Sequence, residues 1–111
     1  MVWNLIIMNR RIGMTSRQRA YLKSLASKEN AIFQVGKASV TPDLTKGISQ
    51  ALKARELVKI SVLKNCMDDP KEIAQMIGER TKSQVIQIIG KKIVFYKPSK
   101  ENPKILLPKD E

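Results

Sequence analysis

Two apolar runs of this chain are each followed closely by a helix start, and this repetition constrains the fold more than any other feature. Thr41-Pro42 and Asp69-Pro70 each place a capping side chain before a proline. Proline suits the first position of a helix, where no N–H is needed. Strands that alternate with helices in this way predict an α/β domain with parallel strands. The two apolar runs cover residues 31–35 and 57–63.

The other segments extend this alternation to the order α-β-α-β-α-β-β. Thr15 is the predicted cap of a first helix that ends near Ser27. Residues 83–89 alternate as a third strand, and Gly90-Lys91-Lys92 predicts a tight turn into a fourth strand at 93–97. We therefore expect one small α/β domain whose sheet is largely parallel and is closed by an antiparallel hairpin.

The two ends of the chain differ from this central domain. Residues 1–13 have no capping residue and no hydrophobic period, so we expect Met14 to be the natural start and the extension not to be native. The alternative is a short extra strand or turn that packs Trp3 and Ile6 on the body. Residues 99–111 read as a polar, basic tail in which only 105–107 could pack on the domain. The domain itself then covers residues 14–98.

The chain lacks the residues that most enzymes and metal sites use. It has no histidine, and Cys66 is its only cysteine, so a histidine base and a cysteine metal cluster are excluded. Neither a Walker A motif nor a G-x-G-x-x-G motif occurs, and we expect no cofactor. The apolar run 2–8 is far shorter than the ~20 residues of a membrane span. These features predict a cytoplasmic, non-enzymatic protein without a membrane segment.

The net charge indicates the class of partner. Lys and Arg total 21 against 10 Asp and Glu, which gives a formal charge of +11. A domain of this size needs only about 2–8 charges for solubility. The excess creates a positive field that attracts polyanions such as RNA.

A short loop between a strand and a helix is the sharpest candidate site. Gly36-Lys37-Ala38-Ser39 follows the first strand and precedes the cap Thr41. Such a loop presents free backbone N–H groups and the positive end of a helix dipole to an anion. The glycine permits a close backbone approach, and Lys37 adds a point charge. The loop resembles the clamp with which KH domains hold RNA backbone.

Further basic residues could extend this site if the first helix lies beside the loop. Residues 15–64 carry ten basic side chains against three acidic ones. Tyr21 is either part of this surface or a residue at the edge of the core, and each lysine is alternatively a solvated side chain. The predicted RNA-contacting residues outside the loop are Arg17, Arg19, Tyr21, Lys23, Lys46, Lys91 and Lys92.

Five segments together carry a family resemblance. They are TSRQRAYLKSLA (15–26), QVGKASVTPDL (34–44), ALKARELVKI (51–60), VLKNC (62–66) and VIQIIGKKIVFYKP (85–98). In combination they resemble the bacterial stand-alone CRM domain, the YhbY-like family, over most of the chain from Met14 to Pro98.

The resemblance implies a mixed four-stranded sheet with three helices, similar to the C-terminal domain of translation initiation factor three. It implies an RNA-binding protein that associates with precursors of the large (50S) ribosomal subunit and assists their maturation. The family's RNA-contacting loop has glycines at both ends and maps onto 36–39. Here Ser39 replaces the second glycine, and we expect its hydroxyl to donate to a phosphate oxygen instead.

Three other functions remain open at this point. A protein-interaction module would use its charge for solubility, and its binding would not weaken steeply with salt as phosphate-driven RNA binding does. An enzyme acting on RNA would show metal-dependent cleavage, although no carboxylate cluster supports it. Binding to double-stranded DNA is disfavoured, because the sequence shows no helix-turn-helix motif. We expect a monomer, because nothing in the sequence suggests an obligate interface.

Overall fold

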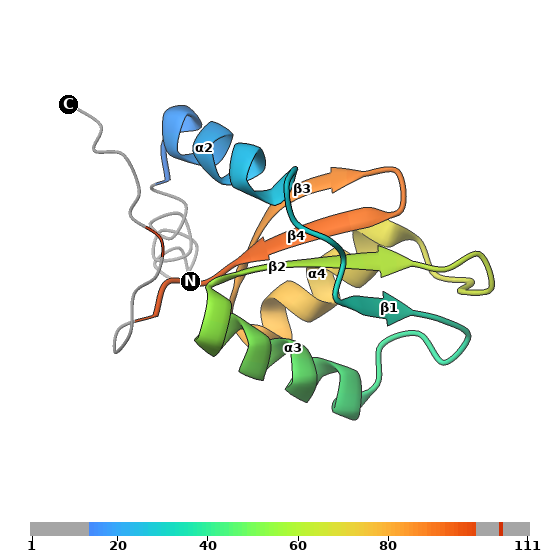
Figure 1. The fold of residues 1–111 in the computed structure, drawn as a ribbon. Coiled ribbons are helices and arrows are strands. Elements are labelled where there is room, and N and C mark those ends of the chain that lie inside the picture. Colours follow the sequence, from blue (N-terminus) through green and yellow to red (C-terminus); the bar gives the residue numbers. More distant parts are fainter. Residues whose placement is uncertain (1–13, 100–104, 106–111) are drawn as a thin grey trace, which may run out of the picture.

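The computed structural model describes residues 14–99 and residue 105. The described part contains three helices and one four-stranded sheet, as expected, in the order α-β-α-β-α-β-β (Figure 1). The predicted extension 1–13, with Trp3 and Ile6, lies outside the described residues. The elements are α2 (Ser16–Ala26), β1 (Phe33–Val35), α3 (Pro42–Arg55), β2 (Leu57–Val62), α4 (Pro70–Thr81), β3 (Gln84–Ile89) and β4 (Lys92–Tyr96).

The sheet has the strand order β1-β2-β4-β3 and is mixed. Only β1 and β2 are parallel neighbours, while β4 pairs antiparallel with both β2 and β3. The mixed sheet that the family resemblance implies is confirmed, whereas the largely parallel sheet expected from the alternation of strands and helices was wrong. Helical crossovers do make β1, β2 and β3 run in the same direction, but the return strand of the hairpin lies between β2 and β3. Lys92 is the first residue of β4 and not part of the turn.

Both faces of the sheet carry helices, as Figure 1 shows. Helices α3 and α4 cover one face, where Phe95, Ile60 and Ile73 are fully buried in the larger apolar cluster. Helix α2 covers part of the other face, where Leu22 and Val94 belong to a second cluster. Alternate residues of β2 and β4 point to opposite faces, so these strands contribute to both clusters.

The helix starts follow the predicted capping chemistry. The Thr15 hydroxyl accepts from the Gln18 amide, and the Gln18 side chain accepts from the Thr15 amide, which forms a reciprocal capping box. Thr41 and Asp69 cap α3 and α4, each with proline following. These caps satisfy N–H groups that have no partner within their helices.

Gly47 lies inside α3, where glycine costs about 1 kcal/mol relative to alanine. A Cβ at this position would lie 3.1 Å from Cε1 of Phe33 on β1. This close contact accounts for the glycine, because it lets the helix approach the edge strand of the sheet.

Glu56 joins α3 to β2 and is fully buried. Its backbone is left-handed, with a φ of 67°, and its N–H donates to the carbonyl of Leu52. The two carboxylate oxygens accept from the backbone N–H groups of Ser99 and Ile105, each at 2.6 Å. Ile105 also packs against the apolar cluster under α2. One acidic side chain thus fastens Ser99 and Ile105 to the junction of α3 and β2.

Burial raises the pKa of Tyr96 above its usual value near 10, and the carboxylate of Glu56 raises that pKa further. Folding therefore favours the neutral phenol. The resulting stabilisation is complete below pH ~10 and is lost as the pH rises through the higher pKa of the folded protein. In a Tyr21→Phe variant, which leaves Tyr96 as the only tyrosine, the phenolate absorbance is expected to appear above pH 10. Titration at or below pH 10 would contradict this assignment.

Candidate nucleic-acid interface

Three loops meet at one edge of the sheet, and we call residues 36–41, 63–69 and 90–91 the loop edge. Because β1 and β2 are parallel, the segments that follow them leave the sheet at the same edge (Figure 1). The hairpin turn joins them there, since the amide of Val62 donates to the carbonyl of Lys91 over 2.7 Å. Helices α3 and α4 both begin at this edge, so the positive ends of their dipoles lie there as well.

The Gly-Lys loop, residues 36–39, forms a compact turn within this edge. The amide of Ser39 donates to the carbonyl of Gly36 at 2.9 Å, and this bond closes the turn. Lys37 and Ala38 are exposed at its tip. The loop therefore presents a lysine and adjacent backbone to solvent, next to the start of α3.

Gly36 is not required by the packing of the loop itself. A Cβ here would lie 3.5 Å from Oδ1 of Asn65 and 3.6 Å from Cδ1 of Leu63, which are ordinary van der Waals distances. Its φ also lies outside the left-handed region. A side chain at this position would be tolerated by the folded domain. A requirement for glycine would have to come from a ligand that approaches from outside.

Ser39 stands in a backbone conformation that favours glycine, with a φ of 56°. Its hydroxyl donates to a carboxylate oxygen of Asp68, on the loop after β2. We expected this hydroxyl to face a phosphate, but in the structure it is engaged with an acidic side chain. Asp68 therefore ties the two loops together and also adds a negative charge to the loop that carries Lys37.

Asp68→Asn is expected to tighten binding of a polyanion about two- to threefold at low salt, because it removes this charge. The asparagine Oδ1 can still accept from the Ser39 hydroxyl, so the loop should keep its conformation. Fluorescence anisotropy with labelled RNA at two salt concentrations measures the change. Weaker binding by the folded variant would show that the carboxylate assists the ligand instead of repelling it.

Other lysines lie at the same edge. Lys64 is exposed on the loop after β2, and Lys91 is exposed in the hairpin turn. Lys92 belongs to a row of register partners that crosses all four strands on the face carrying α2. The row consists of Gln34, Ser61, Lys92 and Ile89. Helix α2 leaves that row uncovered, since Ile89 is 59% exposed.

Lys64 was absent from the predicted set, although its place after a strand parallel to β1 could have identified it.

The first helix contributes less to this edge than expected. Nη1 of Arg19 donates to the carbonyls of Val85 and Ile86, at 3.2 and 3.1 Å, where β3 has an irregular register. This arginine anchors α2 to the sheet. Arg17 and Lys23 are exposed on the helix surface.

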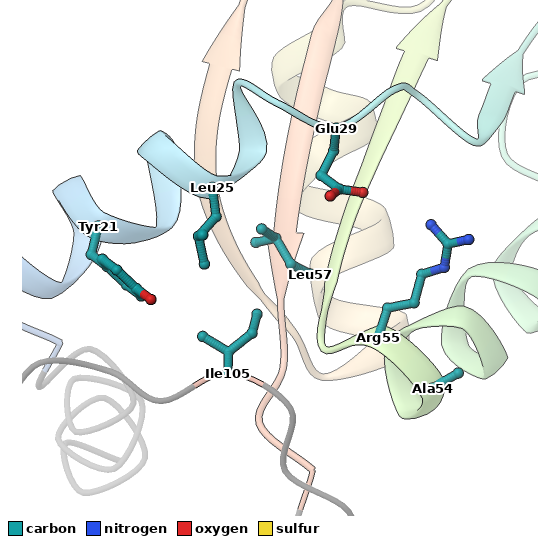
Figure 2. A pocket seen from close by; sticks show the side chains of 7 residues that line it. All are labelled: Tyr21, Leu25, Glu29, Ala54, Arg55, Leu57 and Ile105. Carbon is teal, nitrogen blue, oxygen red and sulfur yellow. The ribbon is translucent and has the colours of Figure 1, made fainter.

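Tyr21 lies at the opposite end of the sheet from the Gly-Lys loop. It is 39% exposed and lines a cavity of about 740 Å³ together with Leu57, the first residue of β2, and Ile105 (Figure 2). Gly36 lies near Leu63 and Asn65, which follow the last residue of β2, so the Gly-Lys loop is at the other end of that strand. The six residues of β2 span roughly 17 Å between these two sites. Tyr21 and Lys37 therefore do not form one continuous surface.

Lys46 is exposed on α3, about one turn beyond the Gly-Lys loop. It lies on the outer surface of the layer formed by α3 and α4, on the other side of the sheet from α2. The predicted residues are thus divided among the loop edge, α2 and the outer surface of α3.

Within residues 14–99 and 105, no three His, Cys, Asp or Glu side chains are grouped so that they could hold a metal ion. None of the helices in that part of the chain is both long and apolar enough to cross a membrane.

Comparison with known proteins gives consistent results. Residues 14–97 match the model of the CRS1 / YhbY (CRM) domain. A Bacillus subtilis protein named "Probable RNA-binding protein YqeI" is 46% identical over 95 residues, covering 86% of this chain and 99% of that protein. A Haemophilus influenzae protein named "RNA-binding protein" is 32% identical over 96 residues, with 86% and 96% covered. The solution structure of SAV1595 from Staphylococcus aureus is similar, with a TM-score of 0.72, 45% identity, and 86% and 99% covered.

Proposed function

Because the chain belongs to the CRS1 / YhbY (CRM) domain family, we propose that it binds RNA through its loop edge and assists assembly of the large ribosomal subunit. The RNA would be large-subunit ribosomal RNA or its precursor particles, bound in the cytoplasm by a monomer. Relatives named RNA-binding proteins support RNA as the partner. The assignment to the large subunit rests on the resemblance to the YhbY-like family.

The loop edge is the observation that carries this proposal. Lys37, Lys64 and Lys91 come from three separate loops and are all exposed there. Two helix N-termini add positive potential at the same edge, and Gly36 leaves room for close backbone approach. Backbone phosphates are the RNA groups that such an arrangement recognises, so we expect it to recognise RNA shape more than base identity.

Cross-linking in cells tests the proposal directly. The protein is cross-linked to RNA by ultraviolet light, the attached RNA is sequenced, and cell extracts are fractionated on a density gradient. Cross-links to large-subunit ribosomal RNA, with the protein in fractions lighter than the mature subunit, are expected. Cross-links scattered over unrelated RNAs would overturn the ribosomal assignment, and an absence of cross-links would favour a protein-interaction module.

A further inference from the structure

A basic groove lies between α3 and α4, on the face of the sheet opposite α2. It has a volume of about 660 Å³. Lys46, Ser49 and Lys53 line it from α3 at spacings of three and four residues, so they share one face of that helix. Arg80, in the last turn of α4, faces them. Three cations from two helices therefore meet along one groove.

The positive charges of the groove have no acidic partner in its lining. Within residues 14–99 and 105, Lys46, Lys53 and Arg80 have no ion-pair partner. The neighbouring acid on α4, Glu79, accepts a hydrogen bond from Gln75 at 3.5 Å on the same helix. The groove thus combines three available positive charges with little local opposition.

The remaining lining residues are suited to a polyanion more than to a protein surface. Thr45, Ser49 and Gln50 add hydroxyl and amide groups, while Pro42 is the only apolar residue of the lining. Protein interfaces depend on buried aromatic and aliphatic anchors, which this groove lacks. Hydroxyl, amide and cationic donors are the groups that contact phosphate oxygens in nucleic-acid complexes.

The groove begins directly after the first segment of the loop edge, residues 36–41. Pro42 lines the groove and follows the cap Thr41 directly. From Pro42 to Lys53 the helix extends roughly 17 Å away from the loop edge. A strand held at Lys37 can therefore continue along α3 without crossing the sheet.

We propose that this groove is a second RNA site, in which Lys46, Lys53 and Arg80 bind backbone phosphates of the strand that contacts the Gly-Lys loop. The inference rests on the proposed function, because it requires RNA at the loop edge. It extends the interface from the loop edge onto the outer surface of the helical layer. It also gives Lys46 a role different from the one expected, since its partners are Lys53 and Arg80 and not the residues of α2.

Single neutralising variants measured against a transcript of large-subunit ribosomal RNA test this site. Lys53→Gln and Arg80→Gln should each weaken binding about three- to tenfold and make the negative slope of log affinity against log salt shallower by about 0.7–0.9. Lys28→Gln is the matched control, because Lys28 is exposed after α2 and lies outside the groove. Lys53→Arg keeps the charge and should retain binding, and circular dichroism confirms that each variant is folded.

The outcomes separate this inference from the proposed function. Wild-type protein that fails to bind the transcript overturns both. If the wild type binds and Lys37→Glu weakens binding, but both groove variants bind like Lys28→Gln, the groove is not an RNA site and the loop edge remains one. Affinity losses without any change in the salt slope would likewise exclude direct phosphate contacts in the groove.

Discussion

Replacing Glu56 with alanine is expected to lower the free energy of unfolding by about 2–4 kcal/mol, the largest effect on stability that we predict. The fully buried carboxylate accepts from the amides of Ser99 and Ile105. Its removal leaves two N–H groups without these acceptors and opens a cavity at the junction of α3 and β2. Alanine also keeps the left-handed backbone at this position, so no strain is relieved.

Urea denaturation measures the loss, and amide hydrogen exchange locates it. The amides of Ser99 and Ile105 should be protected in the wild type and exchange rapidly in the variant. Glu79→Ala, at an exposed position of α4, is the control and should change stability by less than ~0.5 kcal/mol. A Glu56→Ala protein as stable as this control would show that the two hydrogen bonds contribute nothing net.

Lys37→Glu is expected to weaken RNA binding about tenfold at low salt while leaving the stability of the fold nearly unchanged. The side chain is exposed at the tip of the Gly-Lys loop, so the substitution disturbs no packing. It removes one positive charge beside the bound phosphate and introduces a negative one into the loop whose Ser39 already donates to the carboxylate of Asp68. The repulsion should decrease as salt screens it.

Lys28→Glu makes the same change of charge in the exposed turn after α2. This variant should lose far less affinity than Lys37→Glu, because Lys28 follows α2 and belongs to none of the three loops of the loop edge. Binding curves for the two proteins under identical salt conditions give the comparison. If the Lys37→Glu protein binds RNA as tightly as the wild type, the Gly-Lys loop does not take part in RNA binding.

Local signals in the sequence predicted the elements well, because their chemistry is local. The caps Thr15, Thr41 and Asp69 act within one helical turn, and the structure confirms all three. The position of β4 between β2 and β3 could not be predicted from such signals. It depends on which strand pairs with the second side of β2, and the packing of the whole core decides that pairing.

The arrangement of the candidate site was harder to predict for the same reason. Gly36 and Lys37 were identified from their place between a strand and a helix, a local feature. The hydrogen bonds from Arg19 to the β3 carbonyls and from Ser39 to Asp68 join residues that are far apart in sequence. No pattern within one segment indicates such partners. The grouping of Lys46 with Arg80 likewise appears only once α3 and α4 are packed together.

The position of β4 has a consequence for synthesis on the ribosome. The strand that lies between β2 and β3 is the last of the four to be translated. Until residues 92–96 have left the exit tunnel, the nascent chain can pair β1 with β2, but β3 has no neighbour in the sheet. Phe95 also remains unavailable to the larger apolar cluster. This domain should therefore complete its folding in one late step, and a chain stalled before residue 92 should remain sensitive to protease.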